Sequence, residues 1–312
     1  MKRVIVMILS LAVMLSGTAV FAADSILKND GEKFVDIAYN GQVYVALAKS
    51  NQIFNGSTIE YAYPRLYYST DGLTWAKHTL KQPDAYVNSV SANPQSQQQL
   101  VWWASKNKFV FHSVDSTYTS TDGMNWTKDP NIKWSGAAMT EVSGDYLILG
   151  ANQKARAAGN ALKDQTYSVT SNVNYFTRAV AAKPIADDGS IDVFMCGLKY
   201  AYDLKYTPAT DTWTAVSNKS GGYIPATPKD AMYSEKAGQY LIVDGEGGLI
   251  VAVSSTDIKK FTIKPNVNVT GVNASDKYIV VGMSDGTMYY TNNAPITSDT
   301  VWTEIKPFAG AS

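Results

Sequence analysis

A short segment recurs along this chain and limits its fold more than any other feature. Residues 68–75 read YSTDGLTW and residues 119–126 read TSTDGMNW, while residues 255–261 read STDIKKF. Weaker copies lie at 170–176, 207–213 and 291–302. A repeated unit has to be identified first, because it determines what the whole fold is built from. The aromatic residues that close the six copies are Trp75, Trp126, Phe176, Trp213, Phe261 and Trp302.

The spacing of these aromatic residues predicts small β-sheets. Successive rings are 51, 50, 37, 48 and 41 residues apart, a period that suits four short antiparallel strands better than a pair of helices. Turn pairs such as Asn40-Gly41 and Asp122-Gly123 separate runs of β-branched and aromatic residues. The runs that we expect to be strands include 43–47, 146–150, 240–243 and 278–282. The chain beyond residue 22 is therefore predicted to be all-β.

Stacked sheets explain why a large ring recurs in every unit. A lone four-stranded sheet exposes two faces and two edges, whereas sheets packed face to face around an axis cover both faces. A ring that buries about 150–250 Å² would then be the wedge between neighbouring sheets. The Asp of each copy would lie in the turn between the third and fourth strands, where its carboxylate accepts backbone N–H bonds. The carboxylates expected to do so are Asp71, Asp122 and Asp257.

The segment from Ser69 to Trp75 and its copies resemble the Asp-box repeats of sialidase-type β-propellers, although the usual box has one more residue between Asp and Gly. The resemblance implies a propeller whose blades are four-stranded antiparallel sheets, one per unit. Six blades are the simplest count, and a seventh, degenerate blade stays open. Residues 23–312 would then form a single domain.

The first 22 residues have the pattern of a secretory signal peptide. Lys2 and Arg3 precede an apolar run over residues 4–15, and Val20-Phe21-Ala22 suits cleavage after Ala22. The alternative is a retained membrane helix, but the apolar run is short for a membrane span. We therefore expect a secreted, periplasmic or cell-surface protein without membrane insertion.

Charge and cysteine content exclude several classes of function. Lys plus Arg and Asp plus Glu both total 27, so no basic excess predicts nucleic-acid binding. Cys196 is the only cysteine, which excludes an internal disulfide framework and a cysteine-built zinc site. The two histidines, His78 and His112, fall in different units. We expect no metal, no cofactor and a monomeric protein.

Three long connections mark where a binding site is expected, because ordinary connections are short. Residues 49–65 and 152–166 would each join the second and third strands of a blade, and residues 217–230 would join two blades. All three should then emerge on one face of a propeller. The candidate ligand-binding residues on this face are Tyr61, Tyr63, Arg65, Arg156 and Tyr223, and the alternative is that they only steady the loops.

The residues favour binding over catalysis. Arg178 follows Phe176-Thr177 and is expected in a strand at a blade's outer edge, which leaves a sialidase arginine triad incomplete. A glycosidase needs two carboxylates facing one bond, and spacing places no such pair. The predicted function is a non-catalytic binding module for a glycan or protein at the cell surface. The alternative is a carbohydrate-active enzyme, a glycoside hydrolase or lyase with carboxylates near the channel mouth.

Overall fold

The computed structural model describes sixteen stretches of the chain, and every structural statement below refers to them. They are residues 33–49, 53–55, 58–60, 65–70, 76–79, 99–113, 116–129, 138–151, 154–158, 167–168, 177–197, 200–216, 222–224, 228–244, 247–285 and 287–304. The chain divides into two compact units, residues 1–136 with 307–312 and residues 137–306. Residues 1–22, the predicted signal peptide, lie outside the described stretches.

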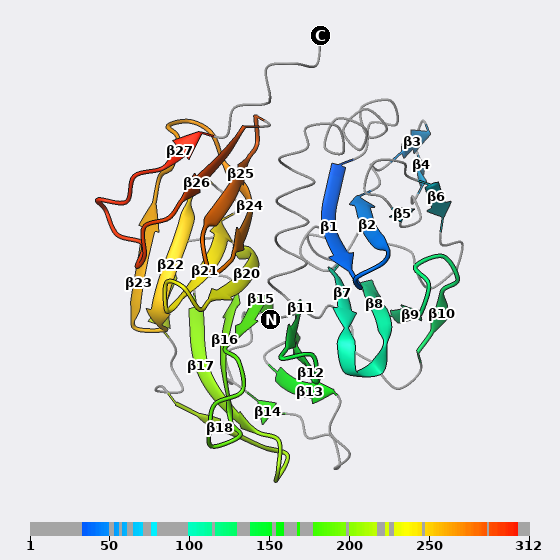
Figure 1. The fold of residues 1–312 in the computed structure, drawn as a ribbon, viewed down its shortest axis with the longest axis horizontal. Coiled ribbons are helices and arrows are strands. Elements are labelled where there is room, and N and C mark those ends of the chain that lie inside the picture. The colour runs from blue at the N-terminus through cyan, green and yellow to red at the C-terminus, as the bar shows by residue number, and fades with distance from the viewer. Residues whose placement is uncertain are drawn as a thin grey trace. The chain divides into compact units, whose positions relative to one another are not determined.

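The described chain is all-β, as predicted (Figure 1). Its strands form six principal antiparallel sheets, which we number blade 1 to blade 6 in chain order. Within the described stretches the one helix is a 3₁₀ turn, Ala104–Lys106, and no helix there is long and apolar enough to cross a membrane. The predicted strands at 43–47, 146–150, 240–243 and 278–282 correspond to β2 (Tyr44–Lys49), β12 (Tyr146–Ala151), β21 (Gln239–Asp244) and β25 (Ile279–Met283).

The first unit contains two four-stranded blades and a hairpin. Blade 1 consists of β1 (Lys33–Tyr39), β2 (Tyr44–Lys49), β5 (Arg65–Ser69) and β6 (Ala76–Thr79). Blade 2 consists of β7 (Gln99–Trp103), β8 (Lys108–Ser113), β9 (Ser116–Ser120) and β10 (Thr127–Lys128). The hairpin pairs β3 (Ile53–Asn55) with β4 (Thr58–Glu60).

The second unit contains four blades. Blade 3 consists of β11 (Ala138–Val142), β12 (Tyr146–Ala151), β13 (Lys154–Ala158) and β14 (Tyr167–Ser168). Blade 4 consists of β15 (Thr177–Ala182), β16 (Ile191–Gly197), β17 (Tyr200–Thr207) and β18 (Thr212–Ala215), with β19 (Gly222–Tyr223) also paired to β17. Blade 5 consists of β20 (Pro228–Ser234), β21 (Gln239–Asp244), β22 (Leu249–Ser254) and β23 (Asp257–Phe261). Blade 6 consists of β24 (Val269–Ala274), β25 (Ile279–Met283), β26 (Met288–Thr291) and β27 (Thr303–Glu304).

The core lies between neighbouring blades, where aliphatic and aromatic side chains from facing sheets meet. One cluster joins blades 1 and 2 through residues such as Leu47 and Phe111. A second joins blades 3 and 4, and a third joins blades 4 and 5, where the rings of Phe194 and Tyr240 stack 4.9 Å apart. Each sheet in these gaps covers a face of the next, which is the packing that the repeat predicted.

Two of the repeated rings pack as wedges between blades. Trp126 is buried against blade 1, and Trp213 is buried against blade 3. Phe261 and Trp302 are only half-buried. In blade 5 it is Ile258 that packs into the gap toward blade 4, so Phe261 does not fill the position that the repeat predicted. Trp75 and Phe176 lie outside the described residues.

The repeat carboxylate has its expected environment at Asp122. This residue lies between β9 and β10, and its Oδ1 accepts hydrogen bonds from the backbone N–H groups of Met124 and Asn125, both at 2.8 Å. The Ser120 hydroxyl donates to the same oxygen. Asp257 differs, because it is the first residue of strand β23 and is exposed, with its carboxylate 3.8 Å from the Lys259 ammonium. Asp71 lies outside the described residues.

Candidate functional site

Three of the five candidate residues predicted from the sequence lie within the described residues. Tyr61 and Tyr63 lie outside the described residues, and Arg65 is the first residue of β5 in the first unit. Arg156 lies in the middle of β13, and Tyr223 lies in β19 with 66% of its surface exposed. The second unit thus holds Arg156 and Tyr223, each on a different blade.

The three long connections contain more regular structure than the sequence suggested. The hairpin β3–β4 lies within residues 49–65, and β19 lies within residues 217–230. The expectation that residues 152–166 join the second and third strands of a blade was wrong. Strand β13 runs through that stretch, because Ala155 and Ala157 alternate into the core between blades 3 and 4, so the longer connection separates the third and fourth strands.

A repeated β-bulge appears instead at the start of the first strand of several blades. In β15, β20 and β24 the pairing with the second strand skips one residue, and β1 has the same irregularity. The extra residues in the second unit are Arg178, Lys229 and Thr270. A bulge bends the strand and changes the direction of a side chain, and bulges are enriched next to functional sites. We call these three residues the bulge row.

Two members of the row, Arg178 and Lys229, lie on first strands of neighbouring blades. Strands β15 and β20 pack side by side, as do β20 and β24. Ala179, which follows Arg178, and Ala231, two residues after Lys229, belong to the same buried cluster. The carboxylate of Asp230 also acts electrostatically on Cys196, whose Sγ lies 3.7 Å from the carbonyl oxygen of Ala179. The bulges of blades 4 and 5 are therefore adjacent.

Arg178 is the most unusual member of the row. Its side chain is half-buried, and burial lowers the pKa of its guanidinium. Within the described part of the chain, the guanidinium makes no hydrogen bond and no ion pair. An arginine stays charged at neutral pH even so. Arg178 is thus a partly desolvated positive charge with no anion beside it among the described residues.

The other groups of the row are open to water. Lys229 and Thr270 have exposed side chains, and so does Asp230, which follows Lys229 in the chain. Asp230 is nevertheless surrounded closely by protein atoms, and this desolvation raises its pKa to about 6, only partly offset by a hydrogen bond from the Ala231 N–H. The row therefore displays two cations and a hydroxyl next to a carboxyl group that titrates near neutrality.

Sequence reasoning missed the row because it misplaced Arg178. We expected this residue at a blade's outer edge, but it lies in β15, the first strand of blade 4. The apolar run that follows it, Ala179 to Ala182, is the signal that could have shown a buried inner strand. A bulge shifts pairing by one residue without a fixed sequence signature, so the register itself could not be read from the repeat.

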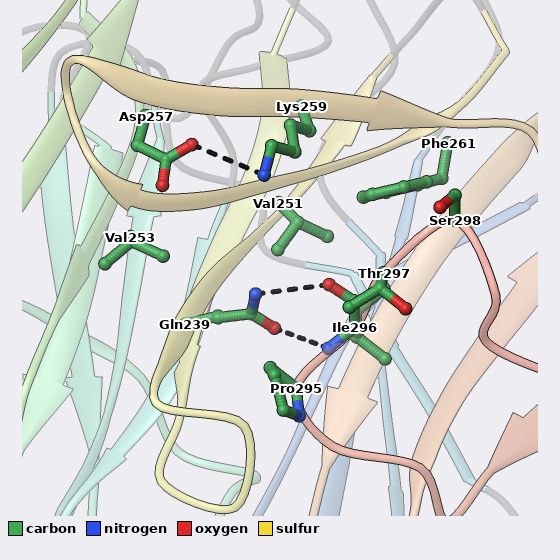
Figure 2. A pocket seen from close by; sticks show the side chains of 10 residues that line it. All are labelled: Gln239, Val251, Val253, Asp257, Lys259, Phe261, Pro295, Ile296, Thr297 and Ser298. Atoms are coloured by element: carbon green, nitrogen blue, oxygen red, sulfur yellow. Dashed lines mark hydrogen bonds and ion pairs between the residues drawn. The ribbon is translucent and has the colours of Figure 1, made fainter.

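A cavity of about 330 Å³ lies on the outer part of blade 5 (Figure 2). Figure 2 shows the side chains of β22 and β23 on one side and the segment 295–298 on the other. The lining residues are Gln239, Val251, Val253, Asp257, Lys259, Phe261, Pro295, Ile296, Thr297 and Ser298.

The repeat turn of blade 6 is longer than that of blade 2, and residues 295–298 of the longer turn line the cavity. In blade 2, Trp126 follows β9 after residues 121–125, whereas in blade 6 Trp302 follows β26 only after residues 292–301. Ile296 of this longer turn is buried. Polar groups of the lining have partners within the protein. Gln239 pairs with Ile296 and Asp257 with Lys259, while the hydroxyls of Thr297 and Ser298 contact Asp299. The cavity therefore offers few groups that could orient a ligand.

Comparisons with known proteins identify the fold. No protein-family model and no curated protein matches the sequence. Among solved structures, the chain is similar to YCF48 bound to D1 peptide, with a TM-score of 0.50 and 11% identity over 88% of this chain and 82% of that one. It is also similar to YCF48 from Cyanidioschyzon merolae, with a TM-score of 0.47 and 12% identity over 88% and 85% of the two chains. The fold is a six-bladed β-propeller, as the sequence predicted.

Proposed function

We propose that this chain is an exported, non-catalytic propeller that binds a protein partner through the bulge row. The observation that carries the proposal is the repeated bulge, which displays Arg178, Lys229 and Thr270 on three consecutive blades. A device that recurs on successive blades and presents polar groups there suits a ligand that spans several blades, as a polypeptide segment can.

The chemistry of the row favours a protein over a glycan. Sugar recognition relies on flat aromatic faces, and the three residues displayed at the bulges are Arg, Lys and Thr. Arg is enriched among the residues that dominate protein interfaces. One of the similar solved structures is itself described as bound to a peptide, which agrees with this proposal but does not carry it.

The row also lacks the groups that a glycosidase would need. Such an enzyme places two carboxylates on either side of one bond, and none of the three displayed residues is a carboxylate. Asp230 is the single carboxyl group next to Lys229 in the chain. Binding therefore accounts for the row more fully than hydrolysis does.

Site-specific photo-crosslinking tests the proposal. A photo-reactive amino acid replaces Thr270, which is exposed on the row, and in a matched variant it replaces Thr256, an exposed residue in the β22–β23 turn of blade 5. After irradiation in the source cells, mass spectrometry should identify a polypeptide adduct at position 270 and not at position 256. Equal labelling at the two positions, or an adduct that is a glycan, would contradict the proposal.

A further inference from the structure

The unpaired guanidinium of Arg178 points to the chemistry of the partner. Its half-buried position limits its contact with water, and no acceptor within the described residues replaces that water. A guanidinium binds a carboxylate through two parallel N–H···O bonds, which are among the stronger hydrogen bonds in proteins. A carboxylate is therefore a chemically suited partner for Arg178.

Lys229 supplies a second positive charge on the neighbouring blade. It occupies the same bulge position in β20 as Arg178 does in β15, and the two strands are in contact. Lys229 is exposed, and like Arg178 it has no ion-pair partner within the described part of the chain. An anion at the row would thus meet a planar guanidinium from one blade and an ammonium from the next.

The charge next to the row favours a singly charged anion. Asp230 follows Lys229 directly, and its carboxyl group adds negative charge near the row at neutral pH. This charge repels a dianion such as phosphate more strongly than a carboxylate. Because the proposed partner is a polypeptide, the carboxylate would come from Asp or Glu side chains or from a chain terminus.

We propose that Arg178 and Lys229 together bind a carboxylate of an acidic polypeptide segment. The proposal rests on the proposed function, since it names the chemical class of the partner at the same site. It extends that function by giving two residues on adjacent blades one shared role.

Arginine-selective NMR tests this assignment directly. The chain has four arginines, of which Arg3 belongs to the predicted signal peptide, so protein labelled with ¹⁵N-arginine gives few Nε–Hε signals, and loss of a signal in Arg178→Gln assigns Arg178. The probes are a short amidated peptide of alternating Gly and Glu, its Gln counterpart with an amidated terminus, the Gln peptide with a free terminal carboxylate, and inorganic phosphate.

A shift of the Arg178 signal with either carboxylate-bearing peptide, and not with the amidated Gln peptide, supports the proposal and identifies the source of the carboxylate. Arg178→Gln and Lys229→Gln should each weaken binding about tenfold, in line with the loss of one charge-assisted bond. Lys236→Gln, in the turn that follows the opposite end of β20, should leave the affinity unchanged and serves as the matched charge control.

No shift with either carboxylate-bearing peptide, or a larger shift with phosphate, overturns the proposal. Equal weakening by Lys229→Gln and Lys236→Gln also overturns it, because the effect would then be one of net charge. A polypeptide crosslink at position 270 together with an unmoved Arg178 signal would retain the protein-binding function and reject the carboxylate. Absence of the crosslink would reject the function itself.

Discussion

The indole of Trp126 stands edge-on to the ring of Phe111, with ring centroids 6.3 Å apart and planes at 88°. This arrangement places the positive edge of one ring against the negative face of the other. The indole Nε1 also donates a 3.0 Å hydrogen bond to the carbonyl oxygen of Gly123. One side chain thus joins the repeat turn of blade 2 to the core between blades 1 and 2.

Replacement of Trp126 by Ala should lower the free energy of unfolding by about 3–5 kcal/mol, because it leaves a cavity in a buried cluster. Trp302 has the same sequence position in its repeat but is half-buried, so Trp302→Ala should cost clearly less. Denaturant unfolding of both variants measures the difference. Equal losses would show that the two rings have the same structural role.

Replacement of Asp122 by Asn should make the free energy of unfolding depend less on pH in the acid range. Burial alone would raise the pKa of Asp122, but hydrogen bonds from Asn125, Met124 and Ser120 hold it well below its usual value. The pKa of this carboxyl group in the unfolded state is about 4. The stabilisation is therefore complete above that pH and is lost as the pH falls further. At pH 7 the variant should lose about 1–3 kcal/mol, and this gap should narrow near pH 3 in denaturant titrations. A gap that stays constant between pH 7 and pH 3 would mean that the ionised carboxylate is not what stabilises the turn.

His112 should destabilise the fold under mild acid. Burial lowers its pKa to about 4, and its Nδ1 lies 2.9 Å from the hydroxyl oxygen of Thr117. Because the folded state keeps His112 neutral, the free energy of unfolding has its full value above about pH 6.5. It falls as the pH drops toward 4, by about 3 kcal/mol in total.

His112→Gln should remove this slope between pH 6.5 and pH 4. The chain has only two histidines, so NMR titration of their ring protons can assign the lower pKa by comparison with the variant. A pKa near 6.5 for His112 would rule out the buried, neutral state.

Gln239 should hold the segment of blade 6 that covers the cavity. Its side-chain Nε2 donates to the Ile296 carbonyl oxygen at 3.3 Å, and the Ile296 N–H donates to its Oε1 at 2.8 Å (Figure 2). Gln239→Leu would leave both backbone groups unpaired at a buried position, at a cost of about 1–3 kcal/mol.

Hydrogen exchange at Ile296 should therefore speed up in Gln239→Leu. In Gln239→Glu it should change less, because the acceptor for the Ile296 N–H is retained. Unchanged exchange in Gln239→Leu would show that other contacts hold the segment.

The repeat predicted the blade count and the strand content, because the alternation of apolar residues and the turn residues are local properties of the sequence. Trp126 and Asp122 also have the environments that the repeat implied. Phe261 does not have the predicted environment. A shift of one residue along a strand moves a side chain to the other face of the sheet. The sequence copy at 255–261 placed its ring on the opposite face of blade 5 from Ile258.

In the candidate site, too, local sequence predicted some features and not others. The long connections predicted Arg65, Arg156 and Tyr223 as site residues, yet Arg156 lies within a regular strand. The bulge row could not be found in this way, because Arg178 and Lys229 are 51 residues apart and meet only through the packing of β15 against β20.

The sequence by itself determined that this chain builds small antiparallel sheets with a repeated turn, since turns and strand alternation depend on neighbouring residues. Only the tertiary structure decided which polar side chains lie together and which lack a partner. Pairing register, bulges and the stacking of one sheet on the next depend on contacts between residues distant in the chain, and these contacts leave no local pattern.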